Sequence, residues 1–335
     1  MKYTLLTILA FLLFPTIAFG ANKPLDIPYT TQIPIGYWAN PWSNACEESS
    51  IMMVDQYYQG TTGRFTNAKA IELIKPFFAH EDKIFGENHD SNSYRTLRLI
   101  NDKTIYTGQI KYRPTLQEIK DHLKLGFPVI SFHNGFALPN KNLHFRAIGS
   151  GYHVMVINGF DNKTSEFITN DPGDTVTGYN HRYDYDKFIN TLGDFDHITK
   201  RVNRKKPKVI LTYPKLVKVD GDDKVYYLKN GEKYLISNPL VYLENNWDTE
   251  NIITIEKQAL DIFKDKYPLT SKKPSPAGYI IAKTKNSNNL YYVEDGIKYY
   301  ITHPNVLKKR GWHKDKIEIV SQKLIDSLKK GKNVW

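Results

Sequence analysis

The sequence predicts an α+β protein with one mixed domain over residues 24–214 and two small α+β modules after it. Apolar residues at helical spacing mark the first part of the domain, and strand-like apolar runs mark its second part. The C-terminal third contains an internal repeat with a constant offset of 65 positions. Helices and strands within one domain, followed by a tandem module, indicate the α+β class.

The domain is predicted to be helical near its N-terminal end and strand-rich toward its C-terminal end. The expected helices lie over 47–59, 68–77 and 116–125, and the expected strands over 128–132, 153–157, 166–170 and 209–213. The dense basic cluster 200–206 is expected to be a solvated loop.

The C-terminal repeat aligns residues 225–263 with residues 290–328 without gaps. Asn230-Gly231 and Asp295-Gly296 occupy matching positions, and these dipeptides favour tight hairpin turns. We therefore expect modules over 216–266 and 287–335, joined by a linker over 267–286. The shared residues of the first copy are Tyr226, Tyr227, Gly231, Lys233, Tyr234, Ile236, Pro239, Val241, Trp247, Ile252 and Asp261. Their aromatic side chains form either the core of each module or a surface that contacts cell-wall or other glycans.

The first twenty residues have the pattern of a secretory signal peptide. An apolar run over 5–19 precedes Gly20, and Ala18 and Gly20 supply small residues for cleavage. A signal peptide over residues 1–20 predicts that the protein is secreted or extracytoplasmic. An uncleaved anchor is the alternative, although the run is short and contains Pro15. No second stretch could span a membrane, so no stable span is expected after cleavage.

The net charge of +11 suggests acidic partners or simply solubility. No nucleic-acid-binding motif is present. No metal or cofactor is expected either, because His80-Glu81 lacks the second histidine of a zinc helix, and the chain has no cysteine pair.

The single cysteine, Cys46, is predicted to begin a helix, because turn-forming residues precede it and helical spacing follows it. A thiol at a helix N-terminus has a lowered pKa, which favours the nucleophilic thiolate. Glu47 and Glu48 oppose this effect if they point toward the sulfur, and a cationic partner would then be needed. The alternative is an unreactive buried cysteine.

A histidine and an aspartate flank a predicted hairpin. One strand begins at His153, and a second ends just before Asp171. In an antiparallel hairpin centred on Asn162, His153 would face Asp171 at hydrogen-bonding range. A shift of one residue in the register of this hairpin would place Asn170, instead of Asp171, opposite His153. With Cys46, the pair would form a Cys-His-Asp triad. The alternative to a triad is that His153 only caps a strand and Asp171 only belongs to the following turn.

These motifs together resemble those of the cysteine-peptidase family numbered thirty-nine. The best-known members of that family are bacteriocin leader (double-glycine) peptidases, and a further branch consists of stand-alone secreted bacterial proteins. The resemblance covers about residues 25–213 and is carried by the segments 25–32, 44–50, 52–60, 152–161 and 167–173.

The resemblance implies a papain-like fold with Cys46 as nucleophile, His153 as general base and then acid, and Asp171 as the residue that orients the histidine. It also implies that Gln32 and the Cys46 N–H form an oxyanion hole. The chain has Cys-Glu-Glu where transporter-linked members have Cys-Gly, and a longer spacer separates Gln32 from Cys46. Double-glycine specificity is therefore not expected.

The expected function is hydrolysis of peptide bonds in a peptide or protein by an exported cysteine peptidase. The loop 134–151 and the trio Tyr37, Trp38 and Trp42 are candidate walls of the cleft, and packing beside the nucleophile is an equal explanation for the trio. Cell-wall peptides are an alternative substrate. A non-catalytic peptide-binding or surface-binding protein is the alternative class.

Overall fold

A computed structural model describes residues 24–143, 150–237, 240–269, 280–294, 297–310 and 317–335. The expected signal peptide, Pro239, the Asp295-Gly296 turn and Trp312 lie outside the described residues. Among the helices in those ranges, none is long and apolar enough to cross a membrane.

Side chains cap most helices of the first part, although the helix that begins at Cys46 has no side-chain cap. The Thr66 side chain accepts a hydrogen bond from Lys69 N, and Thr115 forms a reciprocal capping box with Glu118. The helices are α1 (Cys46–Tyr58), α2 (Asn67–Phe85), α3 (Ser93–Lys103), α4 (Leu116–Lys124) and α5 (Tyr185–Thr191), with short 3-10 turns η1 (Trp42–Asn44) and η2 (Gly135–Ala137). The predicted helices correspond to α1, α2 and α4, whereas α3 and α5 were not predicted.

A six-stranded antiparallel sheet has the order β1-β8-β2-β3-β4-β5. Its strands are β1 (Tyr106–Tyr112), β2 (Val129–Asn134), β3 (Tyr152–Asp161), β4 (Glu166–Asn170), β5 (His181–Asp184) and β8 (Lys208–Pro214). All four predicted strands of the domain lie in this sheet. Strands β1 and β5, at its two edges, were not predicted.

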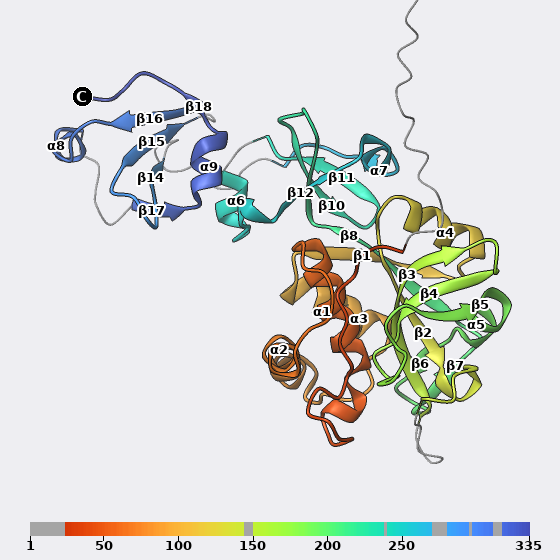
Figure 1. Cartoon of the computed structure of the whole chain (residues 1–335). Helices are drawn as coiled ribbons and strands as arrows, with labels where there is room; N and C mark the ends of the chain where they lie inside the picture. Colours follow the sequence, from red (N-terminus) through yellow and green to blue (C-terminus); the bar gives the residue numbers. More distant parts are fainter. Residues whose placement is uncertain (1–23, 144–149, 238–239, 270–279, 295–296, 311–316) are drawn as a thin grey trace, which may run out of the picture.

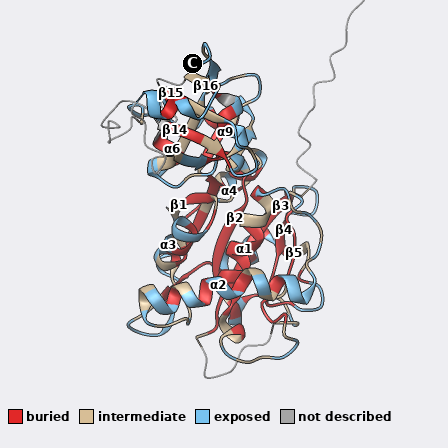
Figure 2. Ribbon diagram, turned by 90° about the vertical axis from the view of Figure 1, so that its left-hand side faces the viewer, coloured by how far each residue is buried: buried red, intermediate tan, exposed pale blue. Residues whose placement is uncertain are grey.

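Both faces of this sheet are buried. Val154 and Val156 of β3 belong to the core cluster that contains residues of α1, α2 and α3, whereas Met155 and Ile157 belong to the cluster with residues of α4 and α5. Figure 1 shows these two groups of helices on opposite sides of the sheet, and Figure 2 shows α1 and the central strands in red, as buried. Successive β3 residues thus point into different cores, as the pleat of a strand requires.

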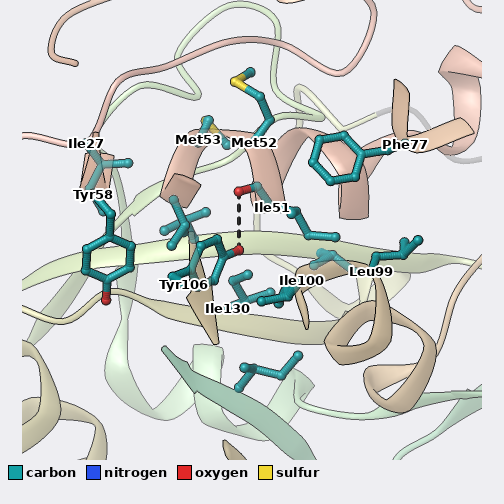
Figure 3. Close-up of a cluster of buried hydrophobic side chains, with 14 of the residues drawn as sticks. Ile27, Ile51, Met52, Met53, Tyr58, Phe77, Leu99, Ile100, Tyr106 and Ile130 are labelled. Carbon is teal, nitrogen blue, oxygen red and sulfur yellow. Dashed lines mark hydrogen bonds between the residues drawn. The ribbon is translucent and has the colours of Figure 1, made fainter. Parts of the chain in front are cut away.

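The cysteine-bearing helix is held against the sheet by one large core. In Figure 3, the buried Tyr106 of β1 lies among Ile51, Ile100 and Ile130, and its hydroxyl donates to the Ile51 carbonyl oxygen at 3.2 Å. This hydrogen bond satisfies the only polar atom of the tyrosine side chain inside an apolar cluster.

The register expected for the β3–β4 hairpin is wrong. Asp161 pairs with Glu166, so the turn is centred between Lys163 and Thr164 rather than on Asn162. The register then shifts between Ile157 and Gly159. The turn causes most of this displacement: Asp161 Oδ1 accepts from Lys163 N at 2.9 Å, and Ser165 adopts a φ of 58°, so the residues between Asp161 and Glu166 form the connection. A bulge at Asn158, whose carbonyl accepts from Leu25 N at 2.7 Å, then changes the pairing by one residue.

The basic cluster 200–206 is not simply a solvated loop. Its residues Arg201–Asn203 form strand β7, which pairs with β6 (Asp194–Asp196) in a separate two-stranded sheet. Val202 lies opposite Phe195 in this ladder. The physical reason is that Val202 packs partly buried against the core cluster that contains α1, while Arg201 beside it is exposed.

Two five-stranded sheets follow, with orders β12-β9-β10-β11-β13 and β17-β14-β15-β16-β18. Elements of the second sheet lie 65 positions after those of the first, as for Val225–Lys229 and Leu290–Glu294. The first set is β9 (Leu216–Val219), β10 (Val225–Lys229), β11 (Glu232–Leu235), α6 (Leu240–Glu244), η3 (Thr249–Asn251), β12 (Ile252–Ile255), α7 (Lys257–Asp261) and β13 (Lys264–Asp265). The second is β14 (Ile280–Thr284), β15 (Leu290–Glu294), β16 (Ile297–Ile301), α8 (Asn305–Lys309), β17 (Ile317–Val320), α9 (Gln322–Ser327) and β18 (Lys329–Lys330).

Hydrophobic contacts continue across these parts of the chain. Leu228 of β10 and Phe263, between α7 and β13, belong to the same core cluster as residues of α1. Tyr242 beside that sheet and Ala282 of the second share another cluster, against which Trp247 packs. The Trp247 ring stacks on Tyr227 with 4.5 Å between centroids, so this aromatic pair contributes to packing.

Candidate active site

Cys46 is the first residue of α1, and its side chain is buried. The turn before it is anchored by Trp42, whose ring meets Phe78 of α2 edge-on at 5.1 Å between centroids. As the first helical residue, Cys46 has a backbone N–H without an acceptor in its own helix. The position is therefore suited to stabilising negative charge near the helix start.

The thiol nevertheless faces a carboxylate. Cys46 Sγ donates to Glu47 Oε2 at 3.0 Å, and the other oxygen, Glu47 Oε1, accepts from Ser91 N at 2.6 Å. Burial raises the pKa of Cys46 well above its usual value, and Glu47 raises it further by charge and by hydrogen bonding. The position at the helix N-terminus alone therefore does not determine the protonation state of this thiol.

Two more buried glutamates lie near Glu47. Glu48 and Glu81 are buried and hydrogen-bonded to each other, and burial is the largest cause of the raised pKa of each. Ser91 Oγ donates to Glu81 Oε1 at 2.8 Å. Carboxyl groups that share a buried site favour protonated forms, because like charges repel at short range.

His153 and Asp171 form a buried pair. His153 Nε2 lies 2.7 Å from Asp171 Oδ1. Burial opposes ionisation of Asp171, but the charge of His153 and the hydrogen bonds from His153 and Tyr183 outweigh it, so the pKa of Asp171 is below its usual value. Asn170 points elsewhere, because its Nδ2 donates to the Ile27 carbonyl at 3.0 Å.

The contact forms although the strands are not in the expected register. The β3–β4 ladder ends at Asn170, and the chain then turns through Pro172 and Gly173 beside the histidine. A Cβ on Gly173 would lie 2.7 Å from His153 Cε1. The absent side chain therefore lets the turn fold over the imidazole.

Gln32 links the turn before Cys46 with the turn after Asp171. Its Nε2 donates to the carbonyl of Ser43 at 3.1 Å, and its backbone N donates to the Pro172 carbonyl at 2.8 Å. Only 3% of Gln32 is exposed, which fixes the amide close to the start of α1.

The start of β3 lies close to the start of α1. Helix α1 packs against β3. Burial raises the pKa of Tyr152 well above its usual value, and Glu47 and Cys46 are among the acidic groups that raise it further. Tyr152 precedes His153, so the nucleophile candidate and the histidine strand meet at this point.

Comparison with known proteins identifies the family. Residues 24–209 match the family described as Peptidase_C39 like family, which is more than half of the chain. This chain belongs to the Peptidase_C39 like family. Membership suggests cysteine peptidase activity.

One solved structure similar to this Peptidase_C39 like protein is described as a C39-like peptidase from Bacillus anthracis. The two share 15% sequence identity with a TM-score of 0.35, over 55% of this chain and 94% of that one. No curated protein matches the chain.

Several residues around the site of this Peptidase_C39 like protein were not predicted. Tyr183 of β5 donates from its hydroxyl to Asp171 Oδ2 at 2.6 Å and accepts from Asn140 Nδ2 at 3.0 Å. His133 pairs with His153 across β2 and β3, and burial lowers its pKa to about 3, so it is neutral. In the sequence, Tyr183 and His133 appear only as an aromatic residue and a second histidine in strand-like segments. Neither feature indicates which residue the side chain contacts.

The predicted cleft walls differ in character. Trp42 is buried, whereas 64% of Tyr37 is exposed. Of the loop 134–151, residues 144–149 lie outside the described part, and Leu143 packs partly buried beside the second core. Within the described ranges, no group of three or more His, Cys, Asp or Glu side chains could hold a metal ion.

Proposed function

We propose that the protein is a cysteine peptidase that hydrolyses peptide bonds through Cys46, His153 and Asp171. The observation that carries the proposal is the buried His153–Asp171 pair at 2.7 Å, on a strand packed against the helix that Cys46 begins. Membership of the Peptidase_C39 like family supports the same chemistry.

In the proposed reaction, His153 takes the thiol proton and the Cys46 sulfur attacks the carbonyl carbon. His153 then returns the proton to the leaving amine, which departs and leaves a thioester on Cys46. Water, deprotonated by His153, attacks the thioester and releases the acid product and the thiol. Asp171 holds the imidazole in the tautomer with hydrogen on Nε2 and stabilises its cationic form.

The oxyanion would be stabilised by the Cys46 N–H and the Gln32 amide. The N–H lies in the first turn of α1, where no intrahelical acceptor exists. Gln32 Nε2 lies against the Ser43 carbonyl, so its donation to an oxyanion requires a small rotation away from that oxygen.

We further propose that the protein is exported through residues 1–20, that residues 24–214 carry the reaction, and that the C-terminal sheets are two copies of one repeat module. The equal strand orders and the constant 65-residue displacement support the duplication. The net charge of +11 and the tandem modules support attachment to an acidic cell wall, which would make cell-wall peptides a candidate substrate.

The test compares the wild type with Cys46→Ala and His153→Ala, using His80→Ala as a control, because His80 contacts Asp102 away from the site. Peptide libraries and cell-wall peptides are the substrates. We expect no turnover in Cys46→Ala and a loss of at least about 100-fold in His153→Ala, with His80→Ala unchanged. Turnover that survives both site substitutions would refute the proposal.

A second candidate is a non-catalytic peptide-binding protein, favoured by the burial of Cys46 and its raised pKa. The single thiol makes this testable by alkylation. A thiol that reacts only at alkaline pH in both wild type and His153→Ala, without turnover of any peptide, supports the binding protein.

A further inference from the structure

The acidic residue directly after the cysteine is held in place from two sides. One Glu47 oxygen accepts from the Cys46 thiol at 3.0 Å, and the other accepts from Ser91 N at 2.6 Å. Glu47 has no exposed surface, so solvent does not compete for either bond. A carboxylate anchored by a backbone N–H cannot swing away from the sulfur without leaving that N–H unpaired.

Ser91 also connects this carboxylate to the strand that bears His153. The Tyr152 hydroxyl donates to the Ser91 carbonyl at 2.9 Å, and Tyr152 N donates to Ser150 Oγ at 3.1 Å. Ser150 Oγ in turn donates to Asp90 Oδ2 at 2.7 Å. The short segment Asp90–Ser91 thus bonds to the residue beside the cysteine and to the residue beside the histidine.

We propose that Glu47 is a positioning residue that holds the Cys46 thiol in a resting, protonated form until substrate binding turns the sulfur toward His153. This inference rests on the proposed peptidase function. In the resting form the proton stays on Sγ, between sulfur and Glu47 Oε2. On activation it passes from Sγ to the imidazole, while Glu47 neither gains nor loses a proton and remains bonded to Ser91 N.

The groups that face this thiol all resist a second negative charge. Glu47 and Glu48 of α1 and Asp90 of the loop after α2 raise the pKa of the thiol by their charge, and Tyr152 of β3 is close enough for Cys46 to raise its pKa in turn. In the proposed mechanism His153 takes the thiol proton, so its cationic form is the group that would stabilise the thiolate. Rotation of the sulfur from Glu47 toward His153 therefore acts as the activating step.

The test measures the alkylation rate of the single thiol against pH in the full chain. Glu47→Gln keeps the shape of the side chain and an oxygen for Ser91 N, but it puts an N–H donor where the acceptor Oε2 lies beside the sulfur. Glu48→Gln is the matched control because no hydrogen bond joins Glu48 to the sulfur. We expect the midpoint of the Glu47→Gln profile to fall by about one pH unit or more, and that of Glu48→Gln to fall by less. An unchanged or raised midpoint in Glu47→Gln would overturn the proposal.

A measurement on the unsubstituted protein covers the case in which Glu47→Gln does not fold. The infrared S–H stretching band belongs to Cys46 alone, because the chain has one cysteine. We expect this band at neutral pH, shifted to lower frequency than that of a thiol peptide in water. A missing band, or one at the frequency of the peptide, contradicts a thiol bonded to a carboxylate.

Failure of the resting-form proposal can be distinguished from failure of the proposed peptidase function. Neither alkylation nor the infrared band depends on turnover of a peptide. If His153→Ala changes neither turnover nor alkylation while Glu47→Gln still lowers the midpoint, the peptidase proposal fails and the Cys46–Glu47 contact stands. If turnover depends on His153 but the midpoint does not move in Glu47→Gln, the resting-form proposal alone fails.

Discussion

Asp171 shows how a single carboxylate is fixed by residues from distant parts of the chain. Its Oδ1 accepts from His153 and from Gly173 N at 3.0 Å, and its Oδ2 accepts from Tyr183. Three donors around a fully buried carboxylate lower its pKa and restrict its rotation. The imidazole therefore meets an oxygen whose position is set independently of the histidine.

Removal of the Tyr183 hydroxyl should loosen this carboxylate. We expect Tyr183→Phe to lower the free energy of unfolding by about 2 kcal/mol at pH 7, since a hydrogen bond to a charged, buried group is lost. Urea denaturation measures this change. Tyr185→Phe, which removes a longer bond to Asn162 at 3.3 Å, is the control and should change stability less.

The same carboxylate predicts a pH dependence. Because the pKa of Asp171 is lower in the folded than in the unfolded protein, its contribution to stability is present above about pH 4 and is lost as pH falls through the folded pKa. Replacement by asparagine removes this contribution. Denaturation curves of Asp171→Asn and wild type should therefore converge as pH falls below about 4, and curves that stay equally far apart would contradict the assignment.

Gln32 should affect the chemical step if it serves the oxyanion. We expect Gln32→Ala to lower kcat by about 100-fold with little change in KM, because the donor acts on charge that develops in the transition state. Gln59→Ala, at a surface glutamine bonded to Asp55, is the control. A rise in KM at constant kcat would assign Gln32 to substrate binding instead.

At the scale of elements, spacing predicted which strands would meet but not how they align. The apolar runs that start at His153 and end before Asp171 correspond to β3 and β4, yet their ladder is displaced by the turn between Asp161 and Glu166 and changed by one residue at the Asn158 bulge. The bulge depends on the N-terminal segment, which is more than a hundred residues away in sequence. Helix α3 escaped prediction because polar and charged residues dominate it, and its cap, Asn92, becomes evident only from the structure.

Gly159 within β3 and Gly173 in the turn after β4 allow an effect on packing to be distinguished from an effect on activity. Gly173→Ala would place a Cβ 2.7 Å from His153 Cε1, and Gly159→Ala would place one 2.9 Å from Pro24 Cα. Crowding of this kind costs about 1–3 kcal/mol. We expect both substitutions to lower stability, but only Gly173→Ala to lower kcat/KM at temperatures where the protein stays folded.

At the scale of the whole molecule, the hydrophobic core does not end where the β-sheet with the site ends. The Phe263 ring meets Tyr213 of β8 edge-on at 4.8 Å between centroids, within the cluster that includes α1. The repeat was visible in the sequence because a constant offset needs no structural knowledge. The shared core was not, because apolar residues in a module do not indicate what they pack against.

This shared core predicts an effect of the C-terminal part on the site. Phe263→Ala should lower the free energy of unfolding of the full chain by about 3 kcal/mol, because it leaves a cavity beside Tyr213. The neighbouring Ile262→Ala, at a residue that is 52% exposed, is the control. Alkylation of Cys46 during urea titration reports whether α1 unfolds in the same transition, and a separate transition for α1 would contradict a common core.

The second small sheet is joined to the first in the same manner, through a cluster that includes Tyr242 and Ala282. Shared clusters thus join the sheet that carries His153 to the first small sheet, and the first small sheet to the second. Under the proposed attachment through the C-terminal modules, the bound surface would be linked to Cys46 by packed side chains as well as by the chain itself. Under the proposed peptidase function, the distance between that surface and Cys46 would limit which immobilised peptide bonds the enzyme reaches.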